Sequence, residues 1–286
     1  MYQEYWQLES KPFEPIGDSR YFFLCESHRV ALHKLRYAVE SRRGAALLAG
    51  PSGIGKTLLV RVLREQLGGA GDAGGAGDAG GAVGKFVQVV FPLMSSRDFL
   101  AYLAEQIGAP PVYPPERSVE ESLRRLEFTL GEEALRGRHA VLVVDEAHLL
   151  EDSGLLETLR LLLNLQATGE PMFTLLLVGQ PSLLTAMQRN APLDERLDIK
   201  TLLKPFSAEE TSDYIVHRLN AAGATRAIFS PDAMDVVHQL THGIPRRINR
   251  LCDLALMVGF AGRQHTIDAL QLESVNDELV TVAAAA

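Results

Sequence analysis

The sequence has little cysteine and lacks any long apolar segment. Its two cysteines, Cys25 and Cys252, lie far apart in the chain. Such a pair makes neither a disulfide framework nor a zinc site, so we expect two reduced and partly buried thiols. No apolar run reaches the roughly 18 residues of a membrane-spanning helix. The aromatic and acidic start, MYQEYWQLESKPF, is unlike a secretory signal, and we therefore expect a cytoplasmic protein.

Basic residues are also scarce relative to acidic ones. The 286-residue chain has 28 Lys and Arg against 36 Asp and Glu, a formal net charge of −8. This balance argues against broad nucleic-acid binding, which depends on a basic surface, although it leaves a local basic patch open. Hydrophobic residues make up 47% and charged residues 22% of the chain, which is ordinary for a globular protein of one large or two modest domains.

Short apolar runs alternate with helical patterns up to about residue 205. The runs end at glycine, proline or acidic residues, as buried strands do when they enter a loop. This alternation predicts an α/β fold with a parallel five-stranded sheet flanked by helices. The expected strands lie at 45–49, 85–91, within 139–148, within 172–181 and at 199–206, and the expected helices at 26–43, 56–67, 98–107, 119–135, 155–165 and 182–189.

From Ser207 onward the pattern is only helical. SAEE matches a capping box, with Ser207 at the cap and Glu210 three residues later. SPDA starts another helix, with Ser230 as cap and Pro231 at the first helical position. The predicted domains are a phosphate-loop α/β domain at 1–205, a small all-α lid at 206–276 and a disordered tail at 277–286.

One segment inside the α/β part is nearly all glycine, alanine and aspartate. Residues 68–84, GGAGDAGGAGDAGGAVG, contain a tandem repeat of GDAGGA and almost nothing that could be buried. We interpret this segment as a flexible insertion on the surface between a helix and the next strand, because long surface loops cost little stability.

Residues 50–57, GPSGIGKT, match the pattern G-x-x-x-x-G-K-[ST] in full. The match lies between an expected strand and an expected helix, the context in which this loop binds nucleotide phosphates. Its glycines let backbone N–H groups point at the phosphates, and the helix N-terminus favours anions. Lys56 is expected to reach the β- and γ-phosphates, and the Thr57 hydroxyl to hold Mg²⁺. The predicted cofactors are ATP and Mg²⁺, and the predicted cofactor-binding residues here are Gly50, Pro51, Ser52, Gly53, Ile54, Gly55, Lys56, Thr57 and Leu58.

The run VLVVDE supplies a second part of the expected site. The four apolar residues predict a buried strand, and Asp145 and Glu146 follow directly at its carboxyl end, where ligands bind in open α/β sheets. Asp145 is predicted to hold the Mg²⁺ shell, and Glu146 to polarise an attacking water. A switch that only binds nucleotide does not need the glutamate, so the pair favours hydrolysis.

Two polar residues near these strand ends have more than one interpretation. DEAH also occurs in a class of helicases, but this chain is short and lacks a second motor domain. We therefore interpret His148 as a residue of a helix start rather than a coupling residue. Gln180 follows LLLVG at another strand end. It is predicted to sense the γ-phosphate, with a turn-capping role as the alternative.

Arginines are expected to complete the site. Arg196 lies just before the fifth expected strand and is predicted to face the nucleotide of a neighbouring subunit, where it would stabilise transition-state charge. Arg189 is its competitor, and a solvated arginine is the simpler interpretation. In GIPRRINRL, Arg246 is predicted to reach back to the bound phosphates and couple the lid to the nucleotide state. It is preferred to Arg247 because it comes first after the Gly-x-Pro turn.

The motifs GPSGIGKT, VLVVDEAH, LLLVGQPSL and GIPRRINRLCDLAL together resemble those of AAA+ ATPases. More narrowly, the chain is similar to the ExeA/GspA type, the ATPases of general secretion and pilus-assembly systems. That type begins with a similar Tyr-x-x-Leu-x-x-x-Pro-Phe segment, followed by an aromatic run like RYFFL and a His-containing helix. The resemblance extends from Met1 to about Ser274.

The resemblance implies roles for individual residues and for the whole chain. It implies a homo-oligomer, with hexamers common in the superfamily, and a protein partner in a secretion or envelope system that recruits it to the inner face of the membrane. Members of this type often continue into a transmembrane helix and a peptidoglycan-binding domain, which do not follow TVAAAA here, so a direct cell-wall role is not expected. The implied residues are Lys56 and Thr57 (Walker A), Asp145 and Glu146 (Walker B), Gln180 (sensor 1), Arg246 (sensor 2), Arg196 (finger), and Phe13 with residues 21–24 beside the adenine.

The predicted function is Mg²⁺-dependent ATP hydrolysis by an oligomeric ATPase that energises or regulates the assembly of a secretion, pilus or other envelope complex. The alternative is a DNA-associated matchmaker ATPase of the transposition type, and a third class is a non-hydrolysing nucleotide switch. Residues 206–286 contain six Arg, no Lys and ten Asp plus Glu, which leaves this region near −4. A DNA-binding lid is more often basic, so the charge favours the first function.

Overall fold

The computed structural model describes residues 2–14, 19–68, 83–90, 92–110, 118–151, 153–167 and 169–284. Contacts in space divide the chain into two compact units. The helical unit comprises Met1–Glu26, Pro51–Leu58 and Lys204–Ala286, and the sheet unit comprises Ser27–Gly50 and Leu59–Leu203. Each unit therefore contains segments that are remote in sequence. The predicted domains are instead continuous stretches of the chain, and their boundaries stay a prediction.

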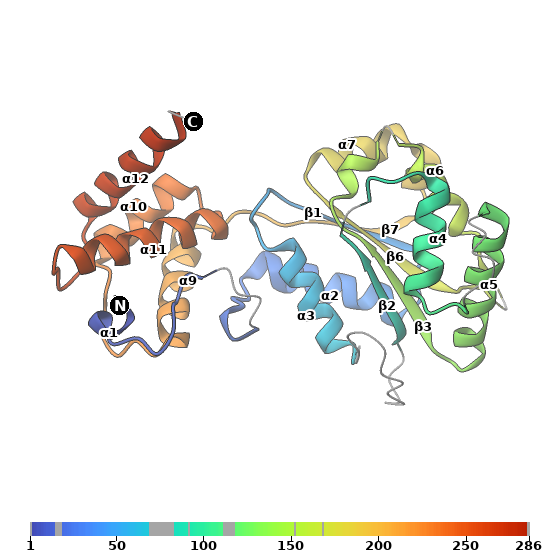
Figure 1. Ribbon diagram of the computed structural model, residues 1–286, viewed down its shortest axis with the longest axis horizontal. Coiled ribbons are helices and arrows are strands. Elements are labelled where there is room, and N and C mark those ends of the chain that lie inside the picture. The colour runs from blue at the N-terminus through green and yellow to red at the C-terminus, as the bar shows by residue number, and fades with distance from the viewer. Residues whose placement is uncertain are drawn as a thin grey trace. The chain divides into compact units, whose positions relative to one another are not determined.

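Five parallel strands form the sheet in the order β2-β3-β6-β1-β7 (Figure 1). Every residue of β1, β3 and β6 is buried, and their sequences are nearly all apolar, as expected for parallel strands covered on both faces. The predicted fold class is confirmed. The strands are β1 (Ala45–Ala49), β2 (Val83–Val89), β3 (His139–Val144), β6 (Phe173–Gly179) and β7 (Leu197–Leu202).

Helices cover both faces of the sheet. Figure 1 shows α2 and α3 on one side of the strands and α4 and α5 on the other. Because strand side chains alternate between faces, Leu47, Leu142 and Leu175 share one core with α4 to α7. The helices are α2 (Glu26–Glu40), α3 (Lys56–Gln66), α4 (Ser96–Gln106), α5 (Val119–Leu135), α6 (Leu155–Leu162), α7 (Ser182–Arg189) and α8 (Ala191–Asp194), with a 3₁₀ turn η2 (Ala147–Leu150) and a short hairpin of β4 (Gln166–Ala167) and β5 (Glu170–Pro171).

The helical unit packs helices from both ends of the chain. The predicted capping box is present: Glu210 N–H donates to Ser207 Oγ at 3.1 Å, and Ser207 N–H donates to Glu210 Oε2 at 3.0 Å. Ser230 likewise caps the next helix, with Pro231 at its first position. The elements are α1 (Tyr2–Trp6), η1 (Ser19–Tyr21), α9 (Ala208–Ala221), α10 (Pro231–Thr241), α11 (Pro245–Ala261) and α12 (Ala269–Ala284).

Two expectations about irregular segments have different outcomes. Helix α12 continues to Ala284, so most of the segment 277–286, expected to be a disordered tail, is helical. The expected flexible insertion at 68–84 lies, for residues 69–82, outside the described residues.

Buried hydrogen bonds hold the N-terminal segment within the helical unit. Trp6 Nε1–H donates to the Leu256 carbonyl at 2.9 Å, and the buried Arg218 guanidinium donates to the carbonyls of Pro12 and Glu14. These bonds satisfy polar groups that would be costly to bury alone. Cys25 and Cys252 form no disulfide, as the sequence predicted, and both are buried, more fully than the partly buried thiols expected. No helix in the described part of the chain is long and apolar enough to span a bilayer.

Candidate active site

Three strands of the sheet unit end together at the carboxyl edge of the sheet. Ala49 pairs with Gly179, and β6 pairs in parallel register with β3. A predicted site residue follows each strand directly: Gly50 after β1, Asp145 after β3 and Gln180 after β6. Parallel pairing therefore brings these positions to one edge, where ligands bind in open α/β sheets.

The phosphate loop follows β1 directly in the chain, and its residues 51–58 belong to the helical unit. Gly53 and Gly55 have φ angles of +79° and +103°, which glycine adopts without the penalty that a side chain would bring. The Lys56 side chain is 6% exposed, and its Nζ donates to the Pro51 carbonyl at 3.1 Å. Thr57 is exposed in the first turn of α3. The lysine thus lies inside the curve of its own loop, while the threonine is open to solvent.

Arg246 lies against the phosphate loop within the helical unit. Its N–H donates to the Gly53 carbonyl at 3.2 Å. A Cβ atom on Gly53 would come within 2.7 Å of Arg246 Cβ and 3.4 Å of an Ile244 methyl group. The Arg246 side chain is exposed beside the loop. The structure therefore brings this predicted sensor to the loop, and the sensor role itself stays a prediction.

The two carboxylates after β3 have contrasting environments. Asp145 is 3% exposed, its N–H donates to the Val89 carbonyl at 2.8 Å, and its Oδ1 accepts the Glu146 N–H at 2.9 Å. Glu146 has a left-handed backbone, with φ 50° and ψ 33°, and its side chain is 46% exposed. Left-handed backbone costs a residue with a side chain about 1 kcal/mol or more, and such strain is concentrated at functional sites. The turn buries the aspartate and leaves the glutamate open to solvent.

His148 lies closer to these groups than the sequence indicated. It does belong to a helix start, in η2, as interpreted from the sequence. Its Nδ1 is also 3.3 Å from Glu146 Oε2 and 3.5 Å from the backbone nitrogen of Gln180. The contact between His148 and Glu146 could have been expected from the sequence, because the two residues are only two positions apart and a tight turn brings such residues together. The second contact depends on the pairing of β3 with β6.

Neither arginine proposed as the finger contacts the carboxyl edge of the sheet in this structure. Arg196 lies at the opposite edge, and Arg189 forms an ion pair with Glu151. Arg196 directly precedes β7, whose first residue, Leu197, pairs with Ala45 at the start of β1. Arg196 therefore lies at the amino edge of the sheet. The strand from Ala45 to Ala49 separates this edge from the carboxyl edge by roughly 13 Å, at 3.3 Å per residue. Its half-buried guanidinium has no ion-pair partner among the described residues, whereas Arg189 Nη1 is 2.7 Å from Glu151 Oε1.

The aromatic residues expected beside the adenine pack in the helical unit. Phe13 is 2% exposed and meets Phe229 edge to face, with ring centroids 6.2 Å apart. Tyr21 is also 2% exposed, and the Arg218 guanidinium lies 4.4 Å from its ring centroid. These contacts account for the burial of both rings, and their role beside an adenine stays a prediction.

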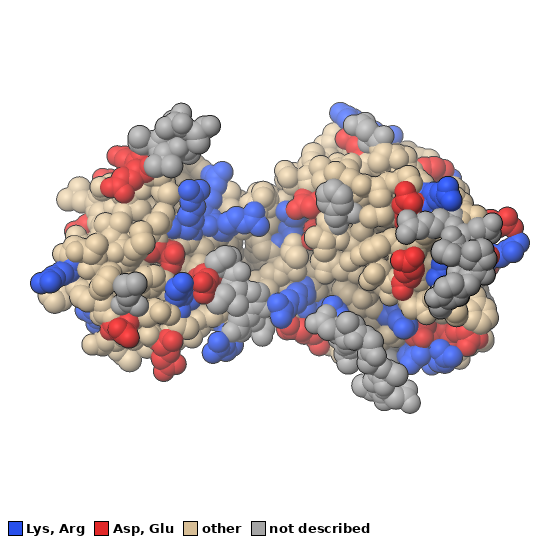
Figure 2. Space-filling view, in the orientation of Figure 1, with Lys and Arg blue, Asp and Glu red and all other residues tan. Residues whose placement is uncertain are grey.

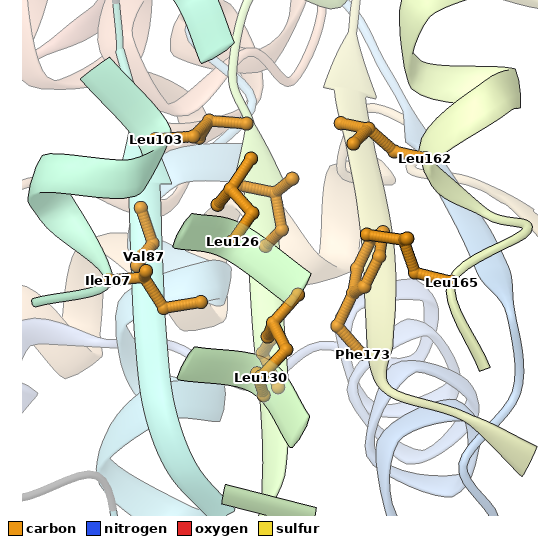
Figure 3. A pocket seen from close by; sticks show the side chains of 11 residues that line it. Val87, Leu103, Ile107, Leu126, Leu130, Leu162, Leu165 and Phe173 are labelled. Carbon is orange, nitrogen blue, oxygen red and sulfur yellow. The ribbon is translucent and has the colours of Figure 1, made fainter. Parts of the chain in front are cut away.

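An internal cavity of the sheet unit is not a candidate for the nucleotide site. Figure 3 shows hydrocarbon side chains from β2, α4, α5 and β6 facing it, among them Val87, Leu126 and Phe173. Its volume is about 30 Å³, enough for little more than one water molecule. Nothing in this lining recognises phosphate or base.

The comparisons with known proteins establish the family. Residues 39–187, more than half of the chain, match the family described as AAA domain. The chain belongs to this family and is an AAA+ ATPase, which confirms the enzyme class expected from the motifs.

A curated relative narrows this similarity. The chain is 32% identical to General secretion pathway protein A of Aeromonas hydrophila over 270 residues. The alignment covers 93% of this chain and 46% of the relative, so the chain spans about half the length of the protein that it matches. The similarity to the ExeA/GspA type that the motifs indicated is confirmed.

Solved structures support the fold alone, because their sequence identities are low. The ORC2 protein of Aeropyrum pernix, solved as ADPNP-ADP complexes, superposes with a TM-score of 0.67 at 17% identity, covering 91% of this chain and 71% of its own. Drosophila ORC bound to DNA gives 0.69 at 16% identity, covering 98% and 66%. The RuvB Holliday junction branch migration motor of Thermotoga maritima gives 0.56 at 19% identity, covering 89% and 69%.

Proposed function

We propose that the chain hydrolyses ATP with Mg²⁺ as an oligomer, and that hydrolysis energises or regulates the assembly of a secretion, pilus or other envelope complex. The hydrolytic part is carried by one observation, the arrival of Gly50, Asp145 and Gln180 at one edge of the sheet. The secretion part is supported by the similarity to General secretion pathway protein A. The proposed location is the cytoplasmic face of a membrane, reached through a protein partner.

The proposed roles follow from where each side chain lies. Lys56, buried in its loop, binds the β- and γ-phosphates together with the loop N–H groups. Mg²⁺ is held by the Thr57 hydroxyl and the Asp145 carboxylate, because oxygen donors suit this hard cation. When bound, the ion neutralises phosphate charge. Glu146, open to solvent, polarises the attacking water, and Gln180 contacts the γ-phosphate.

Arg246 and Arg196 are proposed to couple the nucleotide to motion and to assembly. The backbone hydrogen bond from Arg246 to the phosphate loop supports a role of its side chain in responding to the phosphates. Arg196 is at the amino edge of the sheet and without an ion-pair partner among the described residues. That position suits a finger that serves a neighbouring subunit instead of its own.

The test of hydrolysis uses Glu146→Gln, which keeps the size of the side chain and removes its basicity. We expect turnover to fall roughly 10²- to 10⁴-fold while ATP affinity is retained. Glu157→Gln, at an exposed glutamate paired with Arg160, is the control and should leave both quantities unchanged. Turnover that survives in Glu146→Gln would show that another group activates the water.

The finger role of Arg196 is tested by mixing subunits of two inactive variants. Arg196→Ala and Glu146→Gln subunits lack different parts of a shared site, so a co-assembled mixture should recover part of the ATPase activity. Arg189→Ala replaces Arg196→Ala in the control mixture. Absence of recovery in a mixture shown to co-assemble would rule out a role for Arg196 between subunits.

The test of the partner uses Glu146→Gln with ATP as a trap in a pull-down. A secretion or envelope component in the trapped complex supports the proposal. The charge on the visible face of the sheet unit is mixed, with acidic and basic side chains interspersed in Figure 2. The described side chains on that face thus form no continuous basic field for DNA. Turnover stimulated by duplex DNA at physiological salt would favour the matchmaker function instead.

A further inference from the structure

His148 lies between two residues of the candidate site. Its side chain is 13% exposed, so the imidazole is largely enclosed. Nδ1 is 3.3 Å from Glu146 Oε2 and 3.5 Å from the Gln180 nitrogen. One ring atom therefore touches both the carboxylate after β3 and the backbone that leaves β6.

Local backbone geometry permits this placement. The left-handed conformation of Glu146 turns the chain into η2, which puts His148 two residues beyond the glutamate. Gly179, the last residue of β6, leaves room for the ring, since a Cβ there would lie 3.1 Å from His148 N and 3.4 Å from Nδ1. A side chain at position 179 would compete with the imidazole for this space.

The chemistry of Nδ1 makes the two contacts exclusive. With a proton, Nδ1 donates to the Glu146 carboxylate. Without one, it accepts from the Gln180 N–H. In the structure the Gln180 N–H donates to Nδ1 in a long, weak hydrogen bond of 3.5 Å, while the Glu146 oxygen lies nearer, at 3.3 Å, so Nδ1 can exchange the first partner for the second when it carries the proton.

We propose that His148 is a positioning residue that holds the Glu146 carboxylate beside the segment carrying Gln180. The proposal rests on the proposed role of Glu146 in hydrolysis. A half-exposed glutamate with three rotatable bonds samples many positions, and ordering it costs entropy at the moment of reaction. A hydrogen bond from His148 orders the carboxylate beforehand, which lowers the barrier without changing how ATP binds. Movement of the Gln180 segment would alter that bond.

The first experiment separates positioning from binding. His148→Ala in the full chain should lower kcat about tenfold, with KM and the affinity for ATP within about twofold of wild type. His148→Asn puts an amide near the position of Nδ1 and should restore most of the lost kcat. Leu149→Ala, at the exposed neighbour in η2, is the control and should match wild type. Thermal melting followed by circular dichroism verifies that each variant is folded.

The second experiment tests whether His148 acts through Glu146. Adding His148→Ala to Glu146→Gln should cause no further loss of turnover, because the group it positions is already gone. The inference is overturned if His148→Ala keeps its kcat, if it changes only KM, if His148→Asn is as slow as His148→Ala, or if the losses multiply in the double variant. Turnover surviving in Glu146→Gln alone would instead overturn the proposed function.

Discussion

The two units of this protein build their cores from different side chains. In the sheet unit the buried cluster is aliphatic, with Phe99 and Phe173 as its aromatic members. In the helical unit the cluster is rich in rings: Trp6, Phe13, Tyr21, Phe206, Tyr214 and Phe229. Parallel strands buried on both faces favour small aliphatic side chains, whereas helices and loops from remote parts of the chain leave gaps that large rings fill.

The units also differ in the chemistry of their candidate residues. The sheet unit carries Asp145, Glu146 and Gln180, whose proposed roles concern the metal, the attacking water and the γ-phosphate. The helical unit carries residues 51–58 of the phosphate loop and Arg246, whose proposed roles concern binding of the phosphates, with Thr57 also holding the metal. Changes around Gly53 and Arg246 should therefore alter mainly nucleotide affinity, and changes at Glu146 should alter mainly turnover.

The largest expected effect on stability tests the aromatic core. Phe229→Ala removes a ring that is 1% exposed and packed against Phe13, and should cost about 3–5 kcal/mol. Urea unfolding can be followed by the fluorescence of Trp6, the single tryptophan, which lies in the same core. Leu270→Ala, at a side chain that is 76% exposed, is the control and should change stability by less than about 0.5 kcal/mol. Equal midpoints for the two variants would contradict the importance of the ring cluster.

The next effect is a pH dependence that belongs to the sheet unit. His139 Nε2 is 2.8 Å from Thr174 Oγ1, and that hydroxyl donates its hydrogen to the Arg43 carbonyl, so the neutral imidazole donates from Nε2. Burial, reinforced by nearby Arg42, lowers the pKa of His139 to about 4. The folded state then binds fewer protons than the unfolded state between pH 4 and 6.5. Stability is fully present above pH 6.5 and is lost as pH falls to about 4, by up to about 3 kcal/mol.

This pH dependence is measured by comparing urea unfolding of wild type and His139→Gln from pH 7 to pH 4. Glutamine can donate to the same hydroxyl and does not titrate, so the difference between the two proteins isolates the histidine. The free energy of unfolding of wild type should fall more steeply with acid than that of the variant. Parallel curves would show that His139 is not buried in its neutral form.

A smaller effect tests the contact between the phosphate loop and α11. Gly53→Ala places a methyl group 2.7 Å from Arg246 Cβ and forces a φ of +79°, so the loop has to shift. We expect ATP affinity, measured by titration calorimetry, to fall about tenfold, which is roughly 1.4 kcal/mol. Gly68→Ala is matched in backbone strain, with φ +71°, but meets nothing within 4 Å. Comparable affinity losses in both variants would mean that strain, and not the contact, matters.

The smallest expected effect concerns the start of helix α9 in the helical unit. Ser207→Ala removes both the side-chain acceptor for Glu210 N–H and the capping box, and should cost about 1 kcal/mol in urea unfolding. Ser212→Ala, at a half-buried serine inside the same helix, should be close to neutral. ATP turnover should be unaffected in both. A loss of activity in Ser207→Ala alone would link the helix start to the site.

Much of the sheet unit was predictable because its signals are local. Strands β1, β3 and β6 and the boundaries of α5 and α7 agree with the sequence pattern, since each depends on side chains within one turn or strand. Strands β2 and β7 begin two residues earlier than expected, and β7 ends at Leu202 instead of Phe206. The hairpin of β4 and β5 and the short helix α8 were missed because two- to four-residue elements carry too little periodicity. The register that aligns Ala49 with Gly179 depends on pairing between distant strands and comes only from the structure.

By itself, the sequence determined the phosphate loop, the Asp145–Glu146 pair after a buried strand, and the helix starts at Ser207 and Ser230, because each depends on neighbours within a few residues. Only the tertiary structure decided that Arg246 meets Gly53 and that His148 touches both Glu146 and Gln180. Those contacts join positions separated by a strand, a helix or most of the chain. These contacts depend on helix packing and strand register, which a pattern of neighbouring residues does not encode.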